Sequence, residues 1–295
     1  MRPAPIKILL FACLAMLALA RVHAGEFTIA TWNLEHLNDT VGEGCVPRTR
    51  SDYAELARRI AALDADVVAF QEVENESAAR LVFPAGEWDI AFSTRPSTGP
   101  GPRCYDRPEA RLSHQGTGFA IRSELAWQRH PDLEDIAAGS RNYRWGTDVT
   151  VTLDGHDLRL LSVHLASGCW GEGEDRSSRR SRTCATLREQ FAELGDWVEA
   201  RRNDESAYVM LGDFNRRLAV PGDWGWRALA PRSARLQLLT AEIETECDPD
   251  FTEFVDHIVA NPAASRLLVP GSTRELPRET PHPDHCAIAA TFVLE

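Results

Sequence analysis

The sequence is almost without lysine: Lys7 is the only one, so nearly all of its 32 lysine and arginine residues are arginine. Acidic residues number 44, which gives a formal net charge of −12. An acidic surface repels polyphosphates unless cations or local arginines offset the repulsion. A nucleic-acid substrate would therefore require a metal ion or an arginine patch beside it.

Long apolar runs are absent after the first residues, and no later stretch is apolar enough to span a membrane. The chain begins with the bases Arg2 and Lys7, continues with an apolar run over 8–20, and reaches Ala24 through small residues. This pattern is typical of a secretory signal peptide over residues 1–24. An uncleaved anchor helix is the alternative, but the run is shorter than a bilayer-spanning helix.

We therefore expect a secreted or periplasmic monomer with no stable membrane anchor. Removal of the signal takes away Arg2, Lys7 and Arg21, and changes the net charge from −12 to −15. The remaining chain shows no internal repeat and no disordered linker. We predict one domain over residues 25–295.

Cysteine spacing of the zinc-site type is also missing, since no CxxC pattern occurs. Cys13 lies in the signal, and the even number that remains in an exported chain suggests three disulfides. Many pairings are possible, and free buried thiols are the alternative. Our expectation is Cys45–Cys104, Cys169–Cys184 and Cys247–Cys286. Only the middle pair has a local argument, a short loop closed beside His164.

Apolar segments that alternate or run continuously predict strands, and apolar residues at helical spacing predict helices. The order strand, helix, strand at the start of the mature chain indicates a covered sheet in an α/β protein. The expected helices are 51–63, with Ser51 as N-cap, and 185–202. The expected strands are 26–33, 65–73, 116–122, 147–153, 158–166, 206–215, 254–260 and 286–294.

Polar residues follow several of these apolar runs. In a layered α/β protein, ligands gather where strand ends and loops meet. Residues two apart on an extended segment share one face, so Asp213 and Asn215 would reach into one site. The full set is Asn33, Glu35, Gln71, Glu72, His164, Asp213, Asn215, Asp256, Asp284 and His285.

These residue types suit phosphate-ester hydrolysis assisted by a hard divalent metal. Mg²⁺ prefers carboxylates, water and phosphate oxygens, and histidine adds acid–base capacity near neutral pH. Each residue alone has a plainer explanation, such as a turn, a solvated acid or a core histidine. Asp256, for example, would simply pair with His257 or an arginine. The plainer explanations weaken jointly, because every one of these groups would have to follow a strand by chance.

The motifs TWNLEHL, FQEV, SVHLASG, LGDFN, VDHIV and HPDH resemble, in this order, those of the endonuclease/exonuclease/phosphatase superfamily, the deoxyribonuclease I-like group. The match covers essentially the mature chain, and six ordered motifs are more specific than any one of them. The resemblance implies a four-layer α/β-sandwich in which helices flank two packed mixed β-sheets. It also implies Mg²⁺, or Mn²⁺ or Ca²⁺ in its place.

Carried over by motif, the resemblance implies a role for each polar residue. Glu72 would be the main metal ligand, with help from Asn33, Asp284 and Glu35. Asp213 would position the attacking water together with His285, which Asp256 orients. Asn215 and His164 would hold the phosphate.

Two departures from the family pattern are visible. In the deoxyribonuclease, the second histidine has a glutamate partner, and we find no equivalent for His164. The mid-chain arginine- or tyrosine-containing motif has only RNYRWGTDV as a counterpart, in which Arg144 or Tyr143 would contact phosphate.

The substrate implied is extracellular DNA or RNA, and the expected activity is that of a secreted phosphodiesterase that acts as an endonuclease. A phospholipid phosphodiesterase of sphingomyelinase type, with Trp224 and Trp226 at a lipid interface, is an alternative, as is a phosphomonoesterase. A catalytically inactive binding module on the same fold is a more remote one. Loop arginines would contact phosphate or form surface salt bridges: Arg103, Arg107, Arg111, Arg176, Arg179, Arg180 and Arg182.

Overall fold

A computed structural model describes residues 25–169, 178–203, 206–230, 234–247, 252–280 and 282–293. The predicted signal peptide and Arg176 lie outside the described residues, as do the side chains of Arg179 and Arg180. Among the described residues, no helix is both long and apolar enough to cross a membrane.

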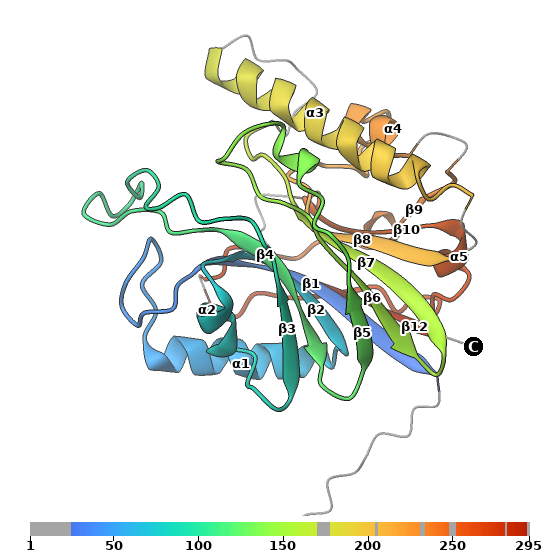
Figure 1. The fold of residues 1–295 in the computed structure, drawn as a ribbon, viewed down its shortest axis with the longest axis horizontal. Coiled ribbons are helices and arrows are strands. Elements are labelled where there is room, and N and C mark those ends of the chain that lie inside the picture. The colour runs from blue at the N-terminus through green and yellow to red at the C-terminus, as the bar shows by residue number, and fades with distance from the viewer. Residues whose placement is uncertain are drawn as a thin grey trace, which may run out of the picture.

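Two mixed six-stranded sheets form the centre of the molecule (Figure 1). The first sheet has the order β11-β12-β1-β2-β4-β3 and the second the order β5-β6-β7-β8-β10-β9. The strands of the first sheet are β1 (Glu26–Leu37), β2 (Val67–Val73), β3 (Trp88–Phe92), β4 (Gly116–Arg122), β11 (Arg274–Leu276) and β12 (Ala287–Val293). Those of the second are β5 (Ala126–Arg129), β6 (Thr147–Leu153), β7 (His156–His164), β8 (Ala207–Asp213), β9 (Gln237–Leu238) and β10 (Asp256–Ala260).

Alternation of side chains along the strands divides the apolar residues among three cores. Phe27 and Ile29 of β1 face the second sheet, whereas Ala30 and Trp32 face the helical side. The helices lie on the two outer faces, α1 and α2 below the first sheet and α3 and α4 above the second in Figure 1. They are α1 (Arg50–Leu63), α2 (Glu76–Arg80), α3 (Ser178–Glu199) and α4 (Trp224–Leu229), with α5 (Pro262–Ser265) after β10.

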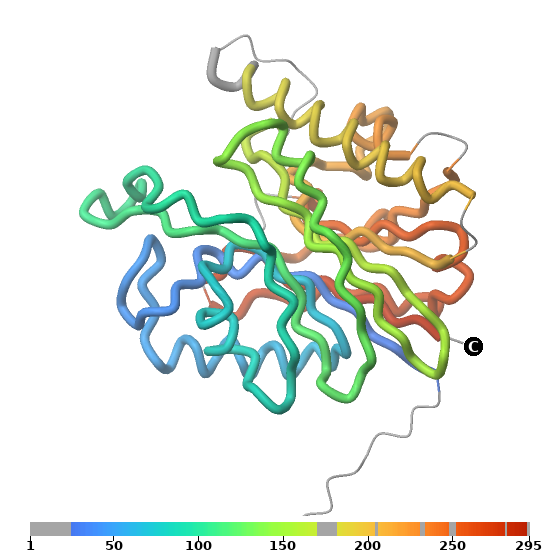
Figure 2. The backbone as a smooth tube through the Cα atoms, viewed as in Figure 1, coloured from blue at the N-terminus to red at the C-terminus, as the bar shows by residue number. Residues whose placement is uncertain are grey.

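The predicted four-layer α/β-sandwich is therefore confirmed. The last strand, β12, runs antiparallel to the first, β1, so that the first and last strands lie side by side in one sheet (Figure 2). Two parallel pairs, β1 with β2 and β7 with β8, place their carboxyl ends at the same edge of each sheet. Short 3₁₀ turns η1 (Asp135–Ala137) and η2 (Leu239–Glu242) complete the order of elements.

Several predicted boundaries differ from the structure: α3, for example, begins at Ser178 rather than at Ala185. Two of the differences have a clear physical reason. The first strand does not end at Asn33, because an irregular register between Asn33 and Leu37 lets β1 continue until Leu37 pairs with Val73. The cap of α1 is Thr49 rather than Ser51, since the Thr49 side chain accepts from the Asp52 amide while the Asp52 carboxylate accepts from the Thr49 amide. This reciprocal pair is a capping box, which satisfies two backbone donors at once.

The structure contains the three expected disulfides, Cys45–Cys104, Cys169–Cys184 and Cys247–Cys286. Cys45–Cys104 joins the β1–α1 loop to the β3–β4 loop, and Cys169–Cys184 joins the segment after β7 to α3. Cys247–Cys286 joins the segment after η2 to the start of β12.

Gly212 of β8 has no room for a side chain. Its φ of +142° lies where glycine is favoured, and a Cβ there would stand 2.0 Å from the Val163 carbonyl oxygen. We expect Gly212→Ala to lower the free energy of unfolding by about 2–5 kcal/mol, measured by urea titration. The control Gly86→Ala also has a positive φ, of +91°, but has open space around it, and should cost about 1–2 kcal/mol. Equal costs for the two variants would contradict the steric explanation.

His257 is a buried core histidine on β10, held by Thr240 Oγ1 at Nδ1 (2.6 Å) and by the Arg216 carbonyl at Nε2 (2.8 Å). Burial lowers its pKa from 6.5 to about 4. Between these values the unfolded chain takes up a proton at His257 that the folded chain does not. The stability contributed by neutral His257 is therefore complete above pH 6.5 and is lost as the pH falls toward 4.

We accordingly expect wild type to lose stability between pH 6.5 and 4 more steeply than His257→Gln, by about 1.4 kcal/mol per pH unit. Urea unfolding at several pH values measures both slopes. Parallel slopes would mean that His257 titrates alike in the folded and unfolded states.

Candidate functional site

The predicted polar residues converge at one edge of the sandwich. In the second sheet, β8 places Asp213 directly beside His164 of β7 on one side and Asp256 of β10 on the other. In the first sheet, Asn33 of β1 lies beside Gln71 of β2. Because these pairs stand at or near the strand ends, their side chains meet where the two sheets face each other.

Hydrogen bonds connect the two sheets at this edge. Asn33 Nδ2 donates to Asp213 Oδ2 over 3.1 Å, and Gln71 Nε2 donates to Ser162 Oγ over 3.2 Å. Asn33, Gln71 and Asp213 are at most 1% exposed. Buried polar groups without partners are costly, so these contacts fix how the sheets meet.

Asp213 is held from two directions. Its Oδ1 accepts from the Asn215 amide at 2.8 Å, while Oδ2 accepts from Asn33. Asn215 has a positive φ of 51°, and its Nδ2 donates to the Leu165 carbonyl at 3.1 Å. Burial, followed by the charge of Asp256, raises the pKa of Asp213 to about 7. Such a carboxyl can take up or release a proton near neutral pH.

His285 and Asp256 form a close pair. His285 Nδ1 donates to Asp256 Oδ2 at 2.6 Å, and His285 Nε2 lies 3.9 Å from Asp213 Oδ2. Burial alone would lower the pKa of His285, but the charge and hydrogen bond of Asp256 raise it well above its ordinary value. Asp256 therefore fixes the ring so that Nε2 faces Asp213.

Glu72 has three basic residues around its carboxylate: His36, Arg144 and His164. Its Oε2 accepts from the His36 amide at 3.1 Å and lies 2.9 Å from His36 Nδ1. Burial would raise the pKa of Glu72, but the hydrogen bond and charge of His36, with the charge of Arg144, hold it well below its ordinary value. Glu72 is thus an ionised carboxylate in a mostly buried position.

His164 is buried between these groups. Its Nε2 lies 3.4 Å from Asp213 Oδ2 and 3.7 Å from Glu72 Oε1. Burial, with the nearby charge of Arg144, lowers the pKa of His164 well below its ordinary value, so the ring is neutral. Within the described part of the chain its Nδ1 has no hydrogen-bond partner, in keeping with the missing glutamate noted from the motifs.

Arg144 reaches the site from the loop before β6. Its Nη2 donates to Gln115 Oε1 and lies 3.8 Å from Glu72 Oε1. Gln115 Nε2 in turn lies 2.8 Å from His36 Nδ1. The sequence did not single out His36 or Gln115. His36 stands in the first-strand motif, and Gln115 directly precedes a predicted strand. These locations in the sequence were the only features that could have identified them as site residues.

Two predicted residues lie at the margin. Glu35 Oε2 accepts from the Asp284 amide at 3.0 Å and lies 2.7 Å from His282 Nδ1, so it anchors the loop before β12. The Asp284 side chain is 58% exposed and lies 3.9 Å from His285 Nε2. Burial and the charge of Asp284 raise the pKa of Glu35.

The donor set fits a hard divalent cation. Glu72 Oε1 is farther than hydrogen-bond distance from both His164 and Arg144, which leaves this ionised oxygen available. Asp213, Asp256 and His285 also bring ligand atoms within 4.8 Å of one another, and Asp256 Oδ1 is buried without a partner among the described residues. A third group, Cys247, Glu275 and Cys286, is unsuitable because its sulfurs form a disulfide.

Glu72 is the better centre for the cation, because the hydrogen bonds of His285 and Asn33 already occupy donors and acceptors around Asp213 and Asp256. Asn33 points its amide nitrogen at Asp213 and its Oδ1 at the Glu35 amide. In this arrangement Asn33 orients Asp213 rather than facing Glu72.

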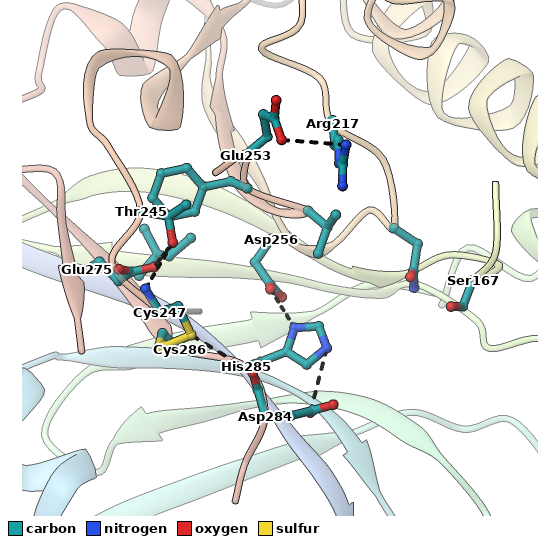
Figure 3. A pocket seen from close by; sticks show the side chains of 14 residues that line it. Ser167, Arg217, Thr245, Cys247, Glu253, Asp256, Glu275, Asp284, His285 and Cys286 are labelled. Atoms are coloured by element: carbon teal, nitrogen blue, oxygen red, sulfur yellow. Dashed lines mark hydrogen bonds and ion pairs between the residues drawn. A yellow bond between two sulfur atoms is a disulfide. The ribbon is translucent and has the colours of Figure 1, made fainter. Parts of the chain in front are cut away.

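A cavity of about 290 Å³ opens beside His285 (Figure 3). Asp256, Asp284 and His285 form one wall, and the Arg217–Glu253 ion pair (3.5 Å) lies on another. The remainder is lined by the Cys247–Cys286 disulfide, by the polar residues Ser167, Asn215, Thr245 and Glu275, and by the apolar residues Phe254, Val255 and Ile288. The site therefore has room for a substrate group next to His285.

Solved structures share this fold at low sequence identity. The catalytic domain of human Nocturnin, with bound sulfate, is 16% identical, with a TM-score of 0.61 over 92% of this chain and 96% of that chain. An AP endonuclease from Archaeoglobus fulgidus is 15% identical, with a TM-score of 0.57 over 90% and 99%. A Neisseria 3′ phosphatase, NExo, in a mutant form bound to a product DNA hairpin, is 17% identical, with a TM-score of 0.58 over 90% and 99%.

At these identities the likeness establishes the fold alone. No curated protein matches the chain. The sequence profile of the Endonuclease/Exonuclease/phosphatase family matches residues 30–278, well over half of the chain. The chain therefore belongs to the Endonuclease/Exonuclease/phosphatase family, whose members are phosphoester hydrolases.

Proposed function

We propose that this protein is a secreted, metal-dependent phosphodiesterase that hydrolyses nucleic acids, with endonucleolytic cleavage as its activity. The observation that carries the proposal is the convergence of Glu72, His164, Asp213 and His285 from both sheets at one edge. Family membership supports phosphoester hydrolysis, and two relatives in fold are an AP endonuclease and a DNA-bound 3′ phosphatase. The disulfides suit an oxidising compartment.

In this proposal Asp213 and His285 position the attacking water. Asn33 and Asn215 aim the Asp213 carboxylate, whose pKa of about 7 suits proton transfer. Asp256 holds the His285 ring with Nε2 toward the reacting phosphate. Neutral His164 and the side-chain amide of Asn215 would hold phosphate oxygens. Arg144 would offset the negative charge that develops on these oxygens.

Glu72 would hold the metal, with Glu35 of β1 and Asp284 of the loop before β12 at the margin of the site, whereas Asn33 would act through Asp213. Mg²⁺, Mn²⁺ or Ca²⁺ would polarise a phosphate oxygen and offset the charge of an acidic protein beside a polyanion. Three of the predicted loop arginines are described and are bonded within the protein. Arg107 is paired with Glu109, and Arg103 and Arg111 donate to backbone carbonyls.

We expect Asp213→Asn and Glu72→Gln each to lower plasmid hydrolysis by about 10²–10⁴-fold while the variants remain folded. Asp213→Asn removes a proton acceptor, and Glu72→Gln removes the charge of the proposed metal ligand. The matched controls are Asp154→Asn, in the β6–β7 turn at the far end of β7 from His164, and Glu124→Gln, which is exposed after β4. Near-wild-type rates in folded Asp213→Asn protein would overturn the assigned roles.

A chelator should abolish plasmid nicking, and Mg²⁺ or Mn²⁺ should restore it. Without a cation, the Glu72 carboxylate would not stabilise the negative charge that develops on the phosphate in the transition state. Appearance of nicked circles before short fragments would identify endonucleolytic cleavage. Nicking that persists in excess chelator would refute the metal requirement, and absence of nicking with every metal would refute the nuclease assignment.

The lipid alternative depended on Trp224 and Trp226 at a lipid interface, but both tryptophans pack against the protein. Trp224 packs edge-on against Phe191 at 5.5 Å between centroids, with the Arg188 guanidinium over its ring at 4.2 Å. Trp226 is half-buried against the same α3 core. Neither tryptophan is presented as a lipid anchor, so nucleic acid remains the substrate class we propose.

A further inference from the structure

The Cys247–Cys286 disulfide stands directly beside the proposed catalytic pair. Cys286 follows His285 in the chain and is 4% exposed, and both cysteines line the same cavity as His285 and Asp256 (Figure 3). His285 belongs to the loop that leads into β12 of the first sheet. Asp256 begins β10 of the second sheet. The His285–Asp256 hydrogen bond therefore spans the two sheets.

The disulfide joins the loop that carries His285 to the segment that follows η2. Cys247 lies between η2 and β10, in a segment of the second-sheet half, and Cys286 precedes β12 in the first. Its Cα atoms are 5.7 Å apart. The other two disulfides stay within one half each, Cys45–Cys104 beside the first sheet and Cys169–Cys184 beside the second. Cys247–Cys286 is thus the disulfide, of the three described, that joins a loop of the first sheet to a segment continuous with η2 of the second-sheet half.

The segment of Cys247 is itself anchored. Glu275 of β11 accepts from Thr245 Oγ1 and from the Glu246 amide, each at 2.8 Å. The loop that carries His285 has no helix or strand among its described residues between β11 and β12. Its contacts to β1 are Trp32 Nε1 to the His285 carbonyl at 3.0 Å and the Asp284 amide to Glu35 at 3.0 Å. These contacts hold the loop to β1, whereas the disulfide holds it to the segment that follows η2, whose Thr240 bonds His257 of β10.

We propose that Cys247 and Cys286 are positioning residues for catalysis: their disulfide keeps His285 at hydrogen-bond distance from Asp256 across the two sheets. A displacement of about 1 Å in a catalytic group costs on the order of 10²-fold in rate. A covalent tie one residue from His285 limits that displacement, whereas the contacts of the loop to β1 do not bridge to β10. The disulfide acts on turnover through His285 and contacts no reacting atom.

The test compares two double variants of the full-length secreted protein. Cys247→Ser/Cys286→Ser should lower kcat on plasmid or a small phosphodiester by about 10- to 100-fold, with KM within about twofold of wild type. Cys45→Ser/Cys104→Ser removes a disulfide that closes a longer segment, 59 against 39 residues, so it should cost at least as much stability. Its kcat should stay within about twofold of wild type. An equal loss of kcat in both pairs would overturn the proposal.

A double-mutant cycle separates positioning from general loosening. If the disulfide acts through His285, its removal from His285→Ala protein should lower the remaining rate by no more than about twofold. Multiplicative losses would show an independent effect and overturn the proposal. If the serine pair does not fold, Cys247→Ala/Cys286→Val keeps apolar volume in the buried wall and replaces it in every comparison.

A readout that needs no substrate accompanies the kinetics, because the positioning role rests on the proposed phosphodiesterase activity. The Nδ1 proton of His285, bonded to Asp256 at 2.6 Å, should give a far-downfield proton resonance that His285→Ala removes. The cysteine pair variant should lose this resonance and the control pair should keep it. Inactive wild type would refute the proposed function alone, whereas a resonance that survives in the folded Cys247→Ser/Cys286→Ser protein would refute the positioning role.

Discussion

The hydrogen bond from Asn33 to Asp213 is the contact on which the arrangement of the site depends, because it joins the two sheets where their polar strand ends meet. The groups nearest to this hydrogen bond each contact one of these two residues. Asn215, His164 and Asp256 surround Asp213, and the Asn33 Oδ1 accepts from the Glu35 amide that begins the turn toward His36. A core of apolar residues between the sheets sets the distance between them. At this distance the Asn33 amide reaches the Asp213 carboxylate.

The positions of the apolar cores and of the polar site both follow from strand geometry. Alternating side chains send one face of each strand into the core between the sheets and the other toward the helices. Only the strand ends are free to carry polar groups that are neither in a core nor in bulk water. Asp213, His164 and Asp256 occupy that position on three adjacent strands, and burial then shifts their pKa values or those of their partners.

Much of this arrangement could be predicted from the sequence. The apolar runs before Glu72, His164 and Asp213 identified their strands, since continuous burial leaves a clear pattern, and the ordered motifs identified the family. The cap of α1 was misplaced because Thr49 and Ser51 are both good caps, and only the geometry of Asp52 decides between them. The extension of β1 past Asn33 depends on pairing with Val73, a contact distant in sequence.

The electrostatic environment was least predictable. Gln115, which precedes β4, and His36 of β1 come together only because the sheet places β2 between β1 and β4, and nothing in their local sequence marks this contact. The direction of each pKa change likewise follows from burial and from neighbours on other strands. Asp213 and Glu72 are both strand-end acids, yet one pKa is raised by burial and Asp256 while the other is lowered by His36 and Arg144.

Four residues around the site have left-handed backbone conformations that glycine would adopt more readily: Glu35, His36, Glu72 and Asn215. Each carries a side chain that bonds within the site, so backbone preference and chemistry pull in opposite directions at these positions. Glycine there would relieve local conformational cost of about 1–2 kcal/mol while removing a functional group. The surrounding structure therefore holds four non-glycine residues in a conformation that costs free energy, and the hydrogen bonds of their side chains offset part of that cost.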